Sequence, residues 1–421
     1  MKYIIRQATI VDHLSSRDGK KKDILINNGI IEKIADKITD KADQEISIPG
    51  LHASPGWIDM QANFRDPGHE YKENLTSGSN AAAKGGFTGV CLQSSTEPTL
   101  DSKSQIEYVK KSAQNLSIHI YPIGAITTKR EGKEMAELFD MNQAGAIAFS
   151  DDKRYVENPK LLELALNYTK NFNGLIIHFA DTPALSLKGM MHEGENSVFL
   201  GMKGIPAMAE EQGLSRDLYL AEYTQGKIHY NLLSSEGSTV LIKDAKKKKL
   251  HVTAGVAAHQ LYFTDEVLKG FESIHKVNPP YRTKKDVDAL INALKDGTFD
   301  TICSDHSPED VENKNLEFEY ARNGIINIQT AFAVANTSLK NKLTLQEIIN
   351  KFAGNPRNIL GLAPATIEEG MTAEITFFDP EATSVFDKET NASNSYNSPF
   401  FGVEFTGKVH GIFCKGKAVI N

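Results

Sequence analysis

Short apolar runs recur along the middle of the chain at intervals typical of alternating strands and helices. Each run is followed by a segment with helical patterning; residues 77–86, for example, are rich in Ala and end in Gly85-Gly86, which suits a helix C-terminus. Eight such units predict an α/β fold, a (β/α)8 TIM-like barrel. The expected strands are residues 56–61, 88–94, 119–126, 146–150, 175–180, 227–233, 250–256 and 300–306.

The two ends of the chain have a different pattern. Residues 24–34, ILINNGIIEKI, are two apolar runs around Asn-Asn-Gly, a set that tolerates the positive φ of a tight hairpin. Residues 374–380 and 409–420 are further short β-rich runs broken by Gly and Pro. We therefore expect residues 1–53 and 366–421 to form a composite β-sandwich domain, and residues 54–365 to form the barrel.

Composition narrows the functional classes. The 421 residues are 40% hydrophobic and 24% charged, which is ordinary for a globular protein. The net charge of −7 gives the protein no overall positive field that would attract nucleic acid or an anionic membrane. The chain also has no run of about 18 apolar residues, the length needed to span a membrane. The three cysteines are far apart in the sequence and fit a reducing compartment, so we expect a cytoplasmic protein.

Polar residues gather where the expected strands end. In a (β/α)8 barrel these ends meet at one face, so a histidine, several carboxylates and an arginine there indicate a metal site or an acid–base site. Each residue alone has a structural alternative, because a strand-end Asp often caps the next helix and a single His is often a core residue. The residues are Asp59, Gln61, Asn63, Arg65, Asp151, Asp152, His178, His229, Asp305 and His306.

One segment carries a specific resemblance. Residues 55–90, PGWIDMQANFRDPGHEYKENLTSGSNAAAKGGFTGV, resemble the strand-one signature of the long-chain dihydroorotases, which belong to the amidohydrolase superfamily. Further similar stretches follow in the same order, at residues 190–211, 276–282, 304–309 and 397–420. The resemblance covers almost the whole chain, and it implies a barrel of the metal-dependent hydrolase type with a β-sandwich built from both termini.

The resemblance also implies a reaction in pyrimidine biosynthesis. Dihydroorotases reversibly hydrolyse dihydroorotate to N-carbamoyl-aspartate, using a water molecule held between two zinc ions. Their six ligand positions comprise a His-x-His pair on strand one, a bridging acidic group, two later histidines and a strand-eight aspartate that also carries the proton. This chain is expected to share the fold of that family, and its ligand positions decide whether it shares the chemistry.

Three of the six ligand positions keep a suitable residue. The resemblance places the bridging carboxylate at Asp151, with Asp152 the less favoured choice, the first later histidine at His178, and the proton-carrying catalytic aspartate at Asp305.

The other three positions are Gln61, Asn63 and Leu232, which are two neutral amides and an aliphatic side chain. Because amide oxygens are poor zinc ligands and Leu cannot bind zinc at all, we expect zinc to be absent, weakly bound or present as a single ion.

The substrate-binding positions are changed as well. Arg65 remains where the family binds the substrate carboxylate, and Asn278 remains as a second contact. Ser95 stands where the family has an amide, and Glu309 stands where it has a carboxylate-binding imidazole. A carboxylate at that position introduces repulsion where binding needs attraction.

These observations leave three hypotheses. The first is a metal-free pseudoenzyme that serves as a structural partner of aspartate carbamoyltransferase, in a homo-oligomer or a hetero-complex. The second is an active cyclic-amide hydrolase that uses a single metal on Asp151, His178 and Asp305, acting slowly on a pyrimidine precursor or on a hydantoin-like ring. The third is a module that binds another small molecule at the barrel mouth.

Overall fold

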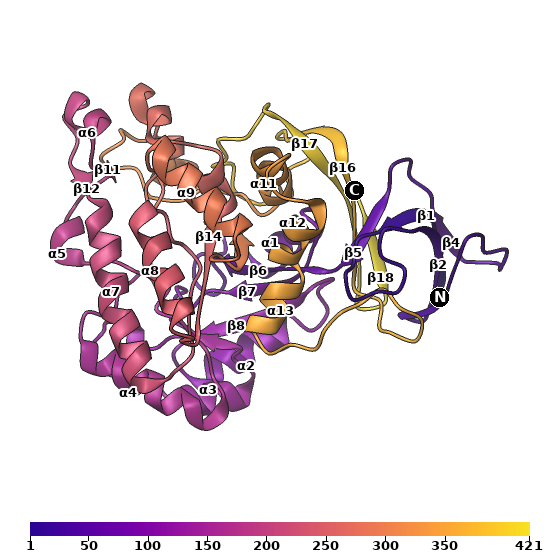
Figure 1. Ribbon diagram of the computed structural model, residues 1–421, viewed down its shortest axis with the longest axis horizontal. Helices are drawn as coiled ribbons and strands as arrows, with labels where there is room; N and C mark the ends of the chain where they lie inside the picture. Colours follow the sequence, from indigo (N-terminus) through magenta and orange to yellow (C-terminus); the bar gives the residue numbers. More distant parts are fainter.

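Eight parallel strands form a barrel in the computed structural model, which describes residues 1–421 (Figure 1). Neighbouring strands pair in sequence order from β6 to β15. The barrel closes where Ala62 bridges His306 and the amide of Asn63 donates to the carbonyl oxygen of His306 at 2.9 Å. All eight predicted strands are confirmed. They are β6 (Trp57–Ala62), β7 (Phe87–Leu92), β8 (His119–Gly124), β9 (Ala148–Phe149), β10 (Ile176–Ile177), β13 (Ile228–Tyr230), β14 (Val252–Ala257) and β15 (Thr301–Cys303).

Helices surround this barrel, so that β6 and β7 are buried at every residue. The helix predicted at residues 77–86 is α1 (Leu75–Lys84), which begins at a capping box formed by Asn74 and Ser77 and ends at Gly85. The other helices around the barrel are α2 (Lys103–Ser112), α3 (Leu138–Ala144), α4 (Pro159–Thr169), α7 (Ala207–Thr224), α8 (Glu236–Lys247), α9 (Lys284–Lys295), α11 (Ala331–Leu339), α12 (Leu345–Phe352) and α13 (Gly354–Ile359).

Shorter elements lie in the connections that follow the strands. One excursion between β10 and β13 carries a two-stranded parallel pair. The long connections after β14 and β15 hold single helical turns. These elements are η1 (Thr128–Arg130), η2 (Lys170–Phe172), α5 (Pro183–Ser186), β11 (Met191–His192), α6 (Glu195–Phe199), β12 (Gly204–Ile205), η3 (Ala258–Leu261), η4 (Asp265–Gly270), η5 (Ser273–His275) and α10 (Val311–Lys314).

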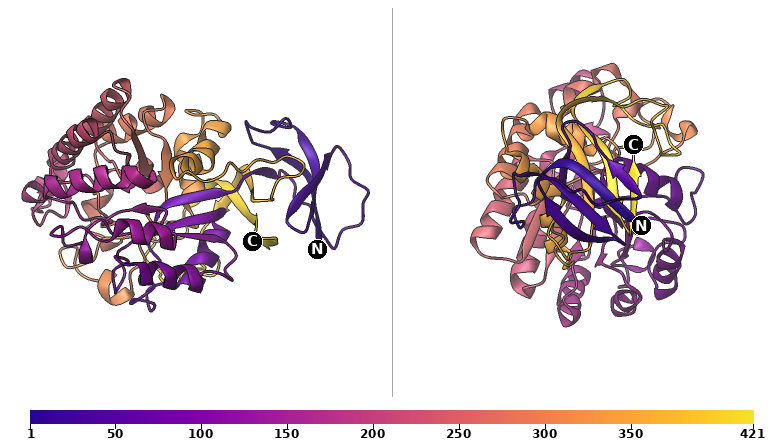
Figure 2. Two further views of the ribbon diagram at one scale, coloured as in Figure 1. Left: turned by 90° about the horizontal axis from the view of Figure 1, so that it is seen from below. Right: turned by 90° about the vertical axis from the view of Figure 1, so that its right-hand side faces the viewer.

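Both ends of the chain contribute to a second sheet outside the barrel (Figure 2). Its order is β18-β17-β16-β5-β1-β2-β3, with β4 added to β1, and many of its apolar side chains share one core cluster, while others pack against the barrel. The hairpin predicted around Asn28-Gly29 is present, and both residues have positive φ. The strands are β1 (Lys2–Ile10), β2 (Lys21–Asn27), β3 (Ile30–Ala35), β4 (Gln44–Ile46), β5 (His52–Pro55), β16 (Ile375–Val385), β17 (Glu404–Cys414) and β18 (Lys417–Ile420).

A half-buried ion cluster joins the outer sheet to the barrel. Glu374 directly precedes β16, and its carboxylate lies 2.8 Å from Nε2 of His119 and 2.7 Å from Nη2 of Arg357. Burial alone would raise the pKa of Glu374, but His119 and Arg357 outweigh burial and lower the pKa to about 2.

This cluster predicts an acid-dependent loss of stability. The folded-state pKa of Glu374 lies below its ordinary value, so its contribution is complete at neutral pH and is lost as the pH falls from about 4.5 through about 2. Replacing Glu374 by Gln is expected to remove up to about 3 kcal/mol of unfolding free energy at pH 7. Urea unfolding at pH 7 and pH 3 tests this, because the difference between variant and parent must shrink at pH 3.

No helix of the structure combines the length and the apolar character that crossing a membrane requires.

Candidate functional site

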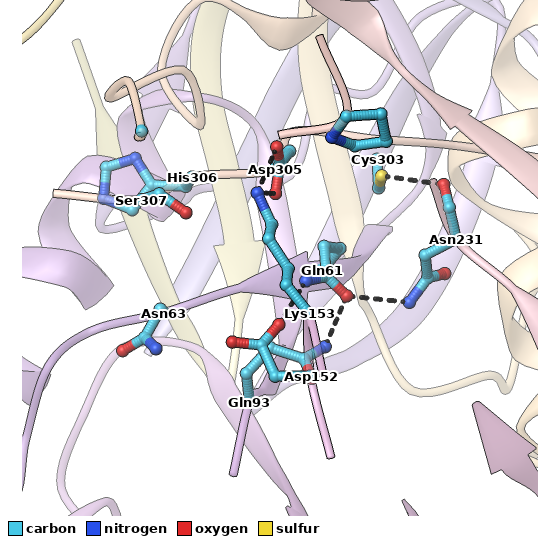
Figure 3. A network of polar contacts seen from close by, with 12 residues as sticks. Gln61, Asn63, Gln93, Asp152, Lys153, Asn231, Cys303, Asp305, His306 and Ser307 are labelled. Carbon is cyan, nitrogen blue, oxygen red and sulfur yellow. Dashed lines mark hydrogen bonds and ion pairs between the residues drawn. The ribbon is translucent and has the colours of Figure 1, made fainter. Parts of the chain in front are cut away.

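Three side-chain amides occupy the centre of the barrel mouth (Figure 3). Oε1 of Gln61, on β6, accepts hydrogen bonds from Nε2 of Gln93 at 2.7 Å and from Nδ2 of Asn231 at 3.1 Å. Nε2 of Gln61 donates to Asp152 at 2.8 Å. We call Gln61, Gln93 and Asn231 the amide cluster. Its members hold one another in place, and none supplies an imidazole or thiolate.

Asn63 extends this hydrogen-bonded system toward the mouth. Its Nδ2 donates to Oγ of Ser95 at 2.6 Å, and Ser95 in turn donates to Asp152. Its Oδ1 accepts from the backbone amide of Arg65 at 2.7 Å. The structure thus brings together Gln61, Asn63 and Ser95, which the sequence placed at the site, and links them through Asp152.

The structure corrects the choice between the two adjacent carboxylates. Asp151, which was expected to face the ligand positions, accepts hydrogen bonds from the backbone amides of Ile126 and Thr127 at 2.8 and 3.0 Å, and from Oγ1 of Thr127 at 2.5 Å. Asp152 is the carboxylate that contacts Gln61. The resemblance did not separate these two neighbours, and local geometry does: β9 has only two residues and Asp152 has a φ of 53°, so the two carboxylates point to different partners.

His178 is present near the end of β10, but both of its ring nitrogens are engaged. Nε2 accepts from the backbone amide of Val156 at 3.2 Å, so Nδ1 carries the proton and donates to Asp217 at 2.7 Å. Asp217 is fully buried and also binds Arg216. Nε2 thus already accepts a hydrogen bond, which must break before His178 can bind a metal ion, whereas the Nδ1 contact with Asp217 is one that metal-binding histidines also make.

Leu232 lies in a small apolar cluster at the mouth. Phe179, Ala257 and Cys303 pack around it, and all four residues are buried. The expected loss of a ligand at this position is therefore accompanied by an apolar environment, in which a bound cation would be poorly solvated.

Asp305, the expected catalytic residue, forms an ion pair with a lysine. Nζ of Lys153 lies 2.7 and 2.8 Å from its two carboxylate oxygens (Figure 3). Nε2 of His259 lies 3.4 Å from Oδ2. The Asp305 side chain is only 3% exposed. Burial alone would raise the pKa of Asp305, but Lys153 and His259 outweigh burial and lower it.

The residues present do not fit a pair of zinc ions. The three retained candidates, Asp151, His178 and Asp305, are bound to backbone amides, to Asp217 and to Lys153 respectively. No three or more His, Cys, Asp or Glu side chains gather in a geometry that could hold a metal ion. A lysine ammonium beside Asp305 also opposes a second cation at the same carboxylate.

The four expected substrate-binding residues do not form one cluster. Arg65 and Glu309 form an ion pair with 2.9 Å between Nη2 and Oε1. Ser95 belongs to the hydrogen-bonded system of Asn63, as described above. Asn278, which precedes a cis peptide bond, lines a separate small pocket together with Asp181 and Arg282.

Four residues of the mouth were missed by sequence reasoning: Lys72, Gln93, Lys153 and Asn231. Lys153 offered a usable signal, because it directly follows the two carboxylates Asp151 and Asp152. Gln93 and Asn231 are amides at strand ends like Gln61, so their shared residue type was also visible in the sequence. Lys72 lies in a connection and gave no signal.

Comparisons with known proteins agree with this geometry at the level of family and fold. A dihydro-orotase-like family model matches residues 52–238. A dihydroorotase from Ruminiclostridium cellulolyticum is 40% identical over 100% of this chain and 99% of its own length. One from Syntrophus aciditrophicus is 38% identical over the same shares.

Solved structures with the same fold are more distant in sequence. An L-hydantoinase from Arthrobacter aurescens superimposes with a TM-score of 0.87 at 22% identity, covering 100% of this chain and 96% of its own. A dihydropyrimidinase from Brevibacillus agri gives 0.84 at 22% identity, with 100% and 95% covered. These likenesses establish the fold, a (β/α)8 barrel with a second sheet beside it.

Proposed function

Because the chain belongs to the dihydroorotase family, we propose that it is a non-catalytic member, which acts in pyrimidine biosynthesis as a structural partner of aspartate carbamoyltransferase. The observation that carries the proposal is the ion pair between Lys153 and Asp305. A covalently attached ammonium group at the proton-carrying aspartate supplies positive charge where the family places metal, but it cannot bind and ionise a water molecule as a metal ion does.

The neighbouring residues support the same proposal. Gln61 and Asn63 use their amides for hydrogen bonds within the protein, and Leu232 packs in a cluster with Phe179, Ala257 and Cys303. A polar site whose donors and acceptors are already paired gains little from binding a metal ion, since these pairs must first be broken.

The proposal predicts that the purified chain does not interconvert dihydroorotate and N-carbamoyl-aspartate, even in saturating zinc. A spectrophotometric assay of both directions should give no rate above the protein-free background. Elemental analysis after zinc loading and desalting should give well under one zinc per chain. A metal-dependent dihydroorotase assayed alongside serves as the positive control for both measurements.

Turnover that depends on added zinc and disappears in Asp305→Ala would reject the proposal in favour of the single-metal hydrolase. The partnership is tested by light scattering with the aspartate carbamoyltransferase of the same organism. A stable complex of defined stoichiometry is expected, and two independent peaks at micromolar concentrations would contradict this part of the proposal.

A further inference from the structure

The carboxylate of Glu309 is bound on both oxygens by cations. Nη2 of Arg65 lies 2.9 Å from Oε1, and Nζ of Lys72 lies 2.6 Å from Oε2. The three side chains are 16%, 11% and 7% exposed for Arg65, Lys72 and Glu309. The arrangement is the one with which proteins bind the carboxylate of a small molecule, but here the carboxylate belongs to the chain itself.

Arg65 is oriented toward this carboxylate by its own backbone and neighbours. It has a φ of 59°, in the left-handed region that non-glycine residues rarely adopt, and its amide is held by Asn63. Its Nε donates to the carbonyl oxygen of Pro308 at 3.0 Å. The guanidinium group therefore faces the connection after β15 that carries Glu309, at the mouth of the barrel.

Removing the Glu309 charge leaves the cations in excess. Asp310 lies 3.6 Å from Nζ of Lys72. Lys314 lies in the same connection, but burial lowers its pKa to about 7, so it is only partly charged at neutral pH. Without the Glu309 carboxylate, two cations, Arg65 and Lys72, would face a single carboxylate, at Asp310. Such a site favours an anion with a compact, planar carboxylate.

We propose that Glu309 is an internal ligand, which occupies a carboxylate-binding site formed by Arg65 and Lys72 and keeps free dicarboxylates out of the barrel mouth. The inference rests on the proposed function only in that a non-catalytic chain has no substrate to admit. Glu309 thereby determines the binding specificity of the mouth, and removing its side chain opens the site to small dicarboxylates.

The test compares binding to the full chain and to Glu309→Ala, in buffer with EDTA so that no metal contributes. Isothermal titration with N-carbamoyl-aspartate and with succinate should show saturable binding to the variant and none to the parent at the same concentrations. The melting temperature of the variant should fall by several degrees and should recover as ligand is added. Glu312→Ala, at an exposed glutamate on α10, is the matched control and should behave as the parent does.

A merely structural role for Glu309 gives a different result, namely a lower melting temperature without recovery or binding. That outcome would overturn the proposal, as would equal binding to the parent chain. Adding Arg65→Ala to the variant should abolish the binding. If Glu309→Ala does not fold, Glu309→Ser, which also removes the carboxylate and empties the space between Arg65 and Lys72, decides by the same criteria. Zinc-dependent turnover of the parent chain would reject the proposed function but not the role of Glu309, because the binding test uses neither metal nor a reaction.

Discussion

Replacing Lys153 by Met is expected to lower the free energy of unfolding by about 3–5 kcal/mol. The variant keeps the length and apolar stem of the side chain but leaves the carboxylate of Asp305, which is 3% exposed, without its cation. His259 is the other basic side chain paired with this carboxylate, and burial lowers its pKa, so it replaces the charge poorly. Urea unfolding followed by circular dichroism measures the loss.

A double-mutant cycle separates the ion pair from other effects of the substitution. Lys153→Met combined with Asp305→Asn removes both charges and should be more stable than Lys153→Met alone, because no unpaired charge remains buried. Lys129→Met, at an exposed lysine without an ion pair, is the matched control and should change stability by less than about 0.5 kcal/mol. If Lys153→Met loses as little unfolding free energy as the control Lys129→Met, the ion pair does not hold the barrel mouth together.

The second large effect is expected from Asp151→Ala, with a loss of about 2–5 kcal/mol of unfolding free energy. The substitution leaves the buried backbone amides of Ile126 and Thr127 without acceptors, and such unpaired groups are costly. Thermal and urea unfolding provide the measurement. The effect concerns the fold rather than chemistry, because these hydrogen bonds position the connection that follows β8.

Asp152→Ala provides the comparison within the same pair of residues. Asp152 is partly exposed and contacts the side chains of Gln61 and Ser95, which can bind water instead. Its loss should therefore cost about 1 kcal/mol, clearly less than that of Asp151. The reverse order would mean that Asp151 faces the site and that the assignment of the two carboxylates is wrong.

The sequence alone predicted most of the fold, for a physical reason. Barrel strands are buried on both faces, so each appears as a continuous apolar run, and all eight runs contain a strand of the barrel. The hairpin at Asn28-Gly29 could also be predicted, because few residue types tolerate positive φ at two successive positions. Local chemistry was sufficient in both cases.

The ligand positions could also be named from the sequence, since motif order places Gln61, Asn63 and Leu232 in register with the family. Their partners could not be named, because hydrogen bonds at the mouth join residues from different strands. Gln61 meets Gln93, just after the neighbouring β7, and Asn231, just after β13, and Lys153 contacts Asp305 at a separation of 152 positions in the sequence. Which donor pairs with which acceptor is decided only when the strands close into the barrel.

Asp151 and Glu309 show most clearly what tertiary structure decided. Strand alternation fails at Asp152, where positive φ turns the chain, so a pattern of residue types could not identify the inward carboxylate. Glu309 was expected to repel a ligand, and in the folded chain its charge is bound by Arg65 and Lys72. Residue identity thus determined which charges the mouth contains, while the fold determined how they pair, because electrostatic pairing depends on distances of a few ångströms that the order of residues does not specify.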